Sequence, residues 1–100
     1  MPFARIALPV PLHRYFDYIL PASMKVVAGA RVLVPFGTQK RVGVVVDVVE
    51  QADVPEEQLK PVLACLDDTS LFSPESWQFL NWAANYYHAP LGEVLSQALP

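Results

Sequence analysis

The spacing of hydrophobic residues changes once along this chain, at Ser73, and this change divides the chain into a predicted β part followed by a predicted helical part. Before Ser73, five short runs rich in β-branched and aromatic residues are bounded by prolines and glycines, which is typical of strands and turns. After it, apolar residues recur every three or four positions, which indicates helix. The strands are expected at residues 3–8, 15–20, 30–35, 40–50 and 59–66.

Two helices are expected after the change. Ser73 is a suitable N-cap, Pro74 fits the first helical position and Glu75 complements the helix dipole. The first helix should cover residues 74–88, and the second should begin at Pro90. The aromatic residues of the first helix are expected to pack in the core. The predicted apolar sides are Trp77, Leu80, Ala84 and Tyr87 in the first helix and Leu91, Val94, Leu95 and Ala98 in the second.

The predicted fold class is mainly β with C-terminal helices. It is a small, partly open β-barrel of about five strands, similar to an OB-fold and capped by two helices. The 100 residues should form a single domain, with strands over 3–66 and helices over 74–99. The valine-rich run from Val42 to Val49 predicts burial on both faces of its strand. Barrels of this kind often bind oligonucleotides, which is an analogy of fold alone.

Composition excludes several classes of protein. The chain is 53% hydrophobic and 17% charged, which is typical of a globular domain. Its longest apolar run is interrupted by Asp47 and is too short to span a bilayer. The first residues lack the layout of a signal peptide, and Cys65 has no partner for an internal disulfide. We therefore expect a cytoplasmic protein with no membrane partner.

Charge is distributed unevenly along the sequence. Residues 1–43 hold six basic residues and one acid, Asp17, which gives 6 − 1 = +5. The remainder holds one basic residue, Lys60, and nine acids, which gives 1 − 9 = −8. This asymmetry favours a side that faces a polyanion. The alternative is that folding brings the two halves together and pairs their charges.

Asp17 is the candidate at the centre of a binding site. On a strand, Phe16 and Tyr18 share one face, while Asp17 lies on the other with Tyr15. A carboxylate among aromatic residues needs a hydrogen-bond partner or a ligand. Two interpretations follow: a locally hydrogen-bonded, structural aspartate on an edge strand, or a recognition site with an acceptor beside aromatic rings.

The sequence carries no recognisable catalytic or metal-binding motif. It has neither a phosphate-binding loop of the Gly-x-x-x-x-Gly-Lys type nor a Gly-x-Gly-x-x-Gly fingerprint. His13 and His88 have no partners at metal-ligand spacing, and Asp17 has no second titrating group beside it in the sequence. We therefore expect no enzymatic activity, no catalytic residues, no metal and no cofactor in this chain.

Three segments carry a resemblance to a known family. They are Ala7-Leu8-Pro9-Val10-Pro11-Leu12 followed by Tyr15-Phe16-Asp17-Tyr18, then Gly29-Ala30-Arg31-Val32-Leu33-Val34-Pro35-Phe36-Gly37, and finally Trp82-Ala83-Ala84-Asn85-Tyr86-Tyr87. Together, and over the whole chain, they resemble the amino-terminal domain of the bacterial primosomal protein N′ family, the PriA replication-restart helicases.

The resemblance implies a function and a larger parent protein. The family's first domain binds DNA and recognises the 3′-hydroxyl end of the nascent leading strand at a stalled, forked replication site. The chain would then be a fragment of an ATP-dependent 3′-to-5′ DNA helicase that uses ATP, magnesium and zinc elsewhere. The implied partners are the other domains of that helicase, primosome proteins and single-stranded-DNA-binding protein.

The resemblance also implies site residues, which the side-chain chemistry extends. The family's 3′-terminus pocket maps onto Phe16, Asp17, Gly37 and Lys60. Asp17 would accept a hydrogen bond from the terminal hydroxyl, and Gly37 would let the backbone approach the sugar. Phe16 or Tyr18 would stack on the base. Lys60 would contact a phosphate, with Lys40 or Arg41 as additional contacts.

Two other functions are compatible with the sequence. One is a protein-interaction module that docks helicase domains or primosome proteins through the aromatic residues of the first helix, Trp77, Trp82, Tyr86 and Tyr87. The other is a generic single-stranded nucleic-acid-binding barrel without preference for ends. Exposure of the helix aromatics would favour the first, and equal binding of free and blocked strand ends would favour the second.

Overall fold

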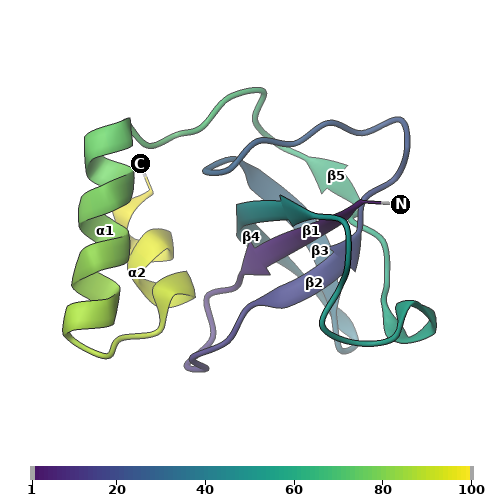
Figure 1. Ribbon diagram of the computed structural model, residues 1–100, viewed down its shortest axis with the longest axis horizontal. Helices are drawn as coiled ribbons and strands as arrows, with labels where there is room; N and C mark the ends of the chain where they lie inside the picture. The colour runs from purple at the N-terminus through teal and green to yellow at the C-terminus, as the bar shows by residue number, and fades with distance from the viewer. Residues whose placement is uncertain (1, 100) are drawn as a thin grey trace.

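A computed structural model describes residues 2–99, which form one five-stranded sheet followed by two helices (Figure 1). Every pair of neighbouring strands is antiparallel, and the strand order is β2-β1-β4-β3-β5. The strands are β1 (Phe3–Ala7), β2 (Phe16–Ile19), β3 (Arg31–Phe36), β4 (Gln39–Val49) and β5 (Ala64–Cys65). The helices are α1 (Pro74–Tyr86) and α2 (Leu91–Ala98), with a short 3₁₀ turn η1 (Glu56–Gln58) before β5.

The sheet curls into a barrel that is not closed. A single parallel bridge joins Ile19 of β2 to Pro61, which precedes β5. It is made by the Ile19 N–H donating to the Lys60 carbonyl at 2.9 Å and the Val62 N–H donating to the Ile19 carbonyl at 3.0 Å. A bulge in the β1–β4 pairing, where the register shifts after Arg5, adds local twist. The predicted partly open barrel of five strands with two C-terminal helices is confirmed.

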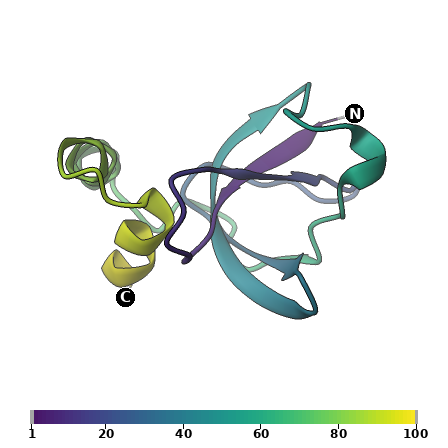
Figure 2. The same cartoon turned by 90° about the horizontal axis from the view of Figure 1, so that it is seen from below.

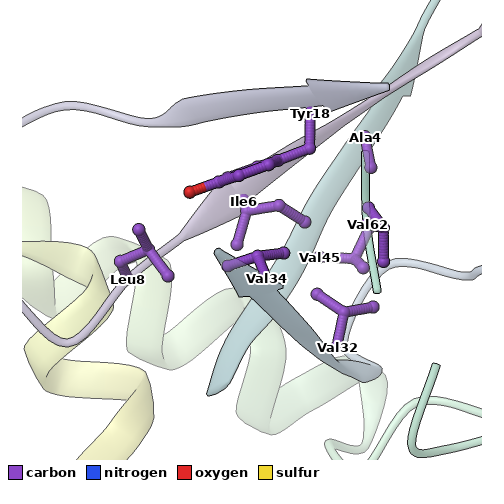
Figure 3. Packing of buried hydrophobic residues seen from close by; sticks show 8 residues of the cluster. All are labelled: Ala4, Ile6, Leu8, Tyr18, Val32, Val34, Val45 and Val62. Carbon is purple, nitrogen blue, oxygen red and sulfur yellow. The ribbon is translucent and has the colours of Figure 1, made fainter. Parts of the chain in front are cut away.

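The interior of the barrel is a cluster of apolar side chains from β1 to β4 and the segment before β5 (Figure 3). Alternation on β3 shows how the sequence sets it: Val32 and Val34 are fully buried, while Leu33 between them is only half-buried. The buried members of the cluster are Ala4, Ile6, Leu8, Tyr18, Val32, Val34, Val45 and Val62.

Two strand predictions are wrong in detail. The valine-rich strand β4 is not buried on both faces, because Val42 and Val48 are exposed and only its middle is covered. The strand expected over residues 59–66 shrinks to Ala64–Cys65. Pro61 lacks a backbone N–H and so cannot donate to a ladder, which limits its segment to the single bridge with Ile19.

The helices cover one side of the barrel, with α2 lying between α1 and the sheet (Figure 2). The Ser73 hydroxyl accepts from the Ser76 N–H at 3.1 Å, so the predicted N-cap is confirmed. Leu95 of α2 is fully buried against Ala7 and Val44. Gly92 permits this approach, because a Cβ there would overlap the carbonyl oxygen of Leu8.

The aromatic residues of α1 do not all enter the core. Trp77 and Leu80 pack, as predicted, against a second apolar cluster, whose buried members are Ala7, Val44 and Leu95. Tyr87, placed on the apolar side by the sequence pattern, is 71% exposed, and α1 ends at Tyr86 rather than at residue 88. Ala98 is also exposed. The residues Phe79, Trp82, Tyr86 and Tyr87 are all more than half exposed and form what we call the aromatic face of α1.

Candidate nucleic-acid interface

A cavity of about 480 Å³ opens between β2, the β3–β4 turn and the segment that precedes β5. Its lining includes all five residues that the sequence predicts to bind a DNA 3′ terminus, and we call it the terminus cavity. Two links hold its walls together: the bridge at Ile19 and a 2.8 Å hydrogen bond from the Tyr18 hydroxyl to the Pro35 carbonyl. The predicted residues in its lining are Phe16, Asp17, Tyr18, Gly37 and Lys60.

Asp17 is held by a network of donors that the local sequence does not reveal. Arg5 lies directly opposite on β1 and donates from Nε to Oδ1 at 3.0 Å and from Nη2 to Oδ2 at 3.3 Å. The backbone N–H of Asp53 donates to Oδ2 at 3.0 Å. Arg5 also lies 3.2 Å from the Asp53 carboxylate. The carboxylate therefore ties β2 to β1 and to the loop after β4, as the structural interpretation of Asp17 requires.

The Asp17 carboxylate is charged and can accept more hydrogen bonds than residues 2–99 donate to it. Its side chain is 5% exposed. Burial acts to raise the pKa of Asp17, but hydrogen bonds from Arg5 and from the Asp53 N–H outweigh it, so the pKa is lowered. An ionised carboxylate offers about four lone-pair positions. Three N–H donors occupy three of them, and by this count one position on Oδ1 receives no donor from residues 2–99.

The two aromatic residues proposed for stacking differ in accessibility. Phe16 is half-buried, lies edge-on to Phe36 with ring centroids 5.3 Å apart, and has the Arg14 guanidinium 4.6 Å from its centroid. Tyr18 is 6% exposed, and its ring belongs to the barrel core. Of the two rings proposed to stack on a base, Phe16 is therefore the more accessible.

Gly37 and Lys60 line the terminus cavity from two different segments, the β3–β4 turn and the segment before β5. Gly37 has φ +61° in the β3–β4 turn, and a Cβ there would meet no atom within 4 Å. Space beside this turn is therefore open to a ligand. Lys60 is exposed on the segment before β5. Lys40 and Arg41 are exposed at the start of β4 and lie outside the cavity lining.

Folding pairs some of the basic residues in the first 43 positions with acidic residues. Besides Arg5, Arg31 forms a bidentate pair with Asp67, with both nitrogen–oxygen distances at 3.0 Å. Arg14 and Lys60 line the terminus cavity together with Asp17 and Asp53, so its lining is mixed in charge. Arg14, Phe36 and Asp53 were missed by the sequence analysis. Arg14 is adjacent to the Phe16 strand and could have been included, whereas nothing local marks Asp53.

Two features are absent from residues 2–99. None of these residues form a group of three or more His, Cys, Asp or Glu side chains arranged to hold a metal ion. No helix in the described part of the chain has the length and apolar character needed to cross a bilayer.

The family described as 3′DNA-binding domain (3′BD) of PriA matches residues 5–100. The chain belongs to the PriA 3′ DNA-binding domain family. It is 56% identical, over its full length, to the replication restart protein PriA of Haemophilus influenzae, and it covers 14% of that protein. It is 32% identical to PriA of Buchnera aphidicola subsp. Schizaphis graminum and 33% identical to PriA of Synechocystis, covering 14% and 12% of their lengths.

Family membership identifies the chain as a DNA-binding domain of the PriA replication restart proteins. The domain spans about a seventh of the PriA proteins it matches. The resemblance found in the sequence is thereby confirmed. The terminus cavity gives this DNA-binding domain a hollow of the size in which small ligands bind.

Proposed function

We propose that the terminus cavity binds the 3′-terminal nucleotide of a DNA strand, with Asp17 accepting a hydrogen bond from the terminal hydroxyl. The observation that carries the proposal is the Asp17 carboxylate, which is charged, fixed by three donors and left with one acceptor position at a cavity beside a half-buried aromatic ring. Membership of the PriA 3′ DNA-binding domain family supports the choice of ligand.

Asp17 would select a strand end by attraction and by repulsion. A terminal 3′-hydroxyl is a donor, and an ionised carboxylate only accepts, so the two form a charge-assisted hydrogen bond. An internal nucleotide has no such donor, and its 3′-phosphate brings a second negative charge toward Asp17. Selectivity built from both a favourable and an unfavourable contact is stronger than either alone.

The other residues of the cavity would hold the nucleotide without reading its base. Phe16, braced by Phe36, offers a ring for stacking, which contributes about 1–3 kcal/mol per base and tolerates any base. Gly37 leaves open space for the sugar. Lys60 would contact the 5′-phosphate of the terminal nucleotide, and Tyr18 would support the wall through its bond to Pro35.

The parent protein's role is also a proposal. In a protein of the length of the PriA relatives, this domain would hold the 3′ end of the nascent leading strand at a stalled fork and help to position the primosome. ATP-dependent 3′-to-5′ unwinding, with its magnesium and zinc, would reside outside these 100 residues, as would contacts with single-stranded-DNA-binding protein. A fork with a nascent 3′ end at its branch should bind the parent more tightly than one without it.

The test of the terminus proposal uses three oligonucleotides that differ only at the 3′ position. A hydroxyl end should bind best, a 3′-deoxy end more weakly because it lacks the donor, and a 3′-phosphate end weakest because it adds charge. Fluorescence anisotropy with a 5′ label measures all three. Equal binding of the three ends would contradict the proposal and leave a barrel that binds single strands without end preference.

A second function is favoured by the aromatic face of α1. Phe79, Trp82 and Tyr86 lie on one side of the helix, with Trp82 and Tyr86 stacked at 4.9 Å, and all remain exposed. A contiguous exposed apolar patch of this kind marks an interaction site. We propose that it docks another domain of the parent protein.

Docking can be tested by mixing this chain with the remainder of a PriA protein made separately. Trp82→Ala should weaken the complex at least tenfold if Trp82 is an anchor, since aromatic anchors dominate interfaces. Gln51→Ala, at an exposed position in the loop after β4 and outside α1, is the control. No complex, or equal loss in both variants, would contradict docking through this face.

A further inference from the structure

A second cavity, of about 290 Å³, lies between the connection from β1 to β2 and the helices, and it adjoins the terminus cavity. We call it the helix cavity. Arg14 and Tyr15, in the connection between β1 and β2, line both hollows, so the two share a boundary. Its other polar lining residues are His13, Asn81, Asn85 and His88.

The helix cavity is suited to an anion. His13 and His88, which are the two histidines of the sequence, come from distant segments and line it together. Arg14 adds a permanent positive charge at the boundary. Among residues 2–99, no aspartate or glutamate lines this cavity, although the whole chain carries a net charge of −3. Imidazole and amide N–H groups supply further donors.

A different hollow lies on another side of the terminus cavity. It has a volume of about 380 Å³, shares Val54 with the terminus cavity, and is lined by Glu50 and Glu56. A nucleotide bound by its 3′ end is joined to its strand only through the 5′-phosphate, so the strand must leave toward one neighbouring surface. Charge opposes the glutamate-lined route and favours the route past Arg14.

We infer that the helix cavity is a second DNA subsite, which takes the one or two nucleotides that precede the 3′ terminus in the same strand. The inference rests on the proposed binding of the terminal nucleotide in the terminus cavity. Arg14, whose guanidinium lies 4.6 Å from the centre of the Phe16 ring, is placed to share with Lys60 the phosphate between the two subsites, which is the 5′-phosphate of the terminal nucleotide. Tyr15 is 44% exposed at the same boundary and offers a ring for the second base.

Asn85 gives a sharp test because it is exposed and lines the helix cavity but not the terminus cavity. Asn85→Asp places a negative charge in the second subsite with almost no change of shape. Gln78→Glu makes the same charge change on the same helix, at an exposed position outside the lining. His13→Ala removes a donor without adding charge. Amide NMR spectra confirm that each variant is folded.

The experiment measures the affinity of thymidine 5′-monophosphate and of oligothymidylates of two, three and four nucleotides, all with a free 3′-hydroxyl, by NMR titration. From the mononucleotide to the trinucleotide, the wild-type affinity should rise by about tenfold or more, as one additional stacked base provides. Asn85→Asp should abolish most of this rise and leave the mononucleotide within about twofold of wild type. Gln78→Glu should keep the rise, and His13→Ala should reduce it.

Three results would overturn the second subsite. The first is an affinity that does not change with length in the wild type. The second is a rise that persists in Asn85→Asp, which would mean that the strand leaves by another route. The third is equal loss in Asn85→Asp and Gln78→Glu, which would mean non-local repulsion. The terminus proposal is judged separately, by whether thymidine 5′-monophosphate binds better than thymidine 3′,5′-bisphosphate.

Discussion

Asp17 and Asp67 each accept two hydrogen bonds from the side chain of an arginine on a strand, yet they lie in different surroundings. Asp17 receives Arg5 and a loop N–H and lines a cavity of about 480 Å³. Asp67 receives the side chain of Arg31 and the Arg31 backbone N–H, the latter at 2.8 Å, and lines none of the cavities described above. The same ion-pair chemistry therefore occurs with and without space for a ligand.

The comparison distinguishes an aspartate that only stabilises the fold from one that also lines a cavity for a ligand. Both aspartates join segments distant in sequence, so a bidentate arginine pair does not by itself indicate binding. What distinguishes Asp17 is its place beside Phe16 and Gly37, where open space meets a charged acceptor. Asp67 is therefore a matched structural control for Asp17.

The largest expected effect is on stability. Asp17→Ala should cost about 1–3 kcal/mol, because it leaves Arg5 and the Asp53 N–H without their acceptor. For a domain of this size, the melting temperature should fall by about 4–8 °C per kcal/mol. Asp67→Ala should cost less, since Arg31 is more exposed than Arg5. Thermal unfolding followed by circular dichroism would contradict this if the Asp67 variant were the less stable of the two.

The next largest effect concerns the open space beside Gly37 in the terminus cavity. Gly37→Asn should weaken binding of a 3′-hydroxyl strand by about tenfold, because its side chain fills the sugar position. Asparagine tolerates φ near +60°, so stability should change little. Titration and urea unfolding measure the two quantities. Unchanged affinity in a stable variant would show that DNA does not approach this turn.

The pH dependence of stability should involve both aspartates. The pKa of Asp17 is lowered overall, because burial raises it less than the hydrogen bonds from Arg5 and the Asp53 N–H lower it. The pKa of Asp67 is lowered by its hydrogen bonds from Arg31. A lowered folded-state pKa stabilises the protein above the unfolded value of about 3.9. That contribution is lost as pH falls through the folded-state pKa. The free energy of unfolding should therefore decline below about pH 4 in the wild type.

The double variant Asp17→Asn, Asp67→Asn checks the origin of this decline. It should be less stable at neutral pH and show a shallower fall in acid, because neither position can then take up a proton. Urea unfolding between neutral pH and about pH 3 provides the measurement. An undiminished acid transition would assign it to other carboxyl groups.

The smallest expected effect is on the salt dependence of binding. Lys60→Gln should reduce the slope of log affinity against log salt by about 0.7, the loss of one phosphate contact to a single strand. Lys40→Gln and Arg41→Gln should change the slope less, since both residues lie outside the cavity lining. Equal changes at all three positions would indicate a diffuse basic surface rather than a phosphate contact at Lys60.

Short-range sequence patterns predicted where helices and strands lie, whereas the pairing of strands determines which side chains meet. The N-cap at Ser73 and the alternation around Val32 depend on neighbours within a few residues, and both were predictable. The partner of Asp17 was not, because Arg5 meets it only through the β1–β2 register. A search for a basic residue on the adjacent predicted strand would have found it.

Burial was the least predictable property. The sequence pattern assigns Tyr18 and Phe16 to one face, but Tyr18 is buried with its hydroxyl bonded to the Pro35 carbonyl, whereas Phe16 is only half-buried. On α1, helical spacing could not show that α2 lies between this helix and the sheet, which leaves Trp82 exposed. The helix cavity likewise depends on tertiary packing.

The central claim, that Asp17 reads the end of a DNA strand, is tested most directly by one ratio. It is the dissociation constant for a 3′-phosphate strand divided by that for the matching 3′-hydroxyl strand, measured for the wild type, Asp17→Asn and Asp67→Asn. We predict a ratio of about ten or more for the wild type and Asp67→Asn, and a ratio near one for Asp17→Asn. A wild-type ratio near one, or a full ratio in a folded Asp17→Asn, would contradict the claim.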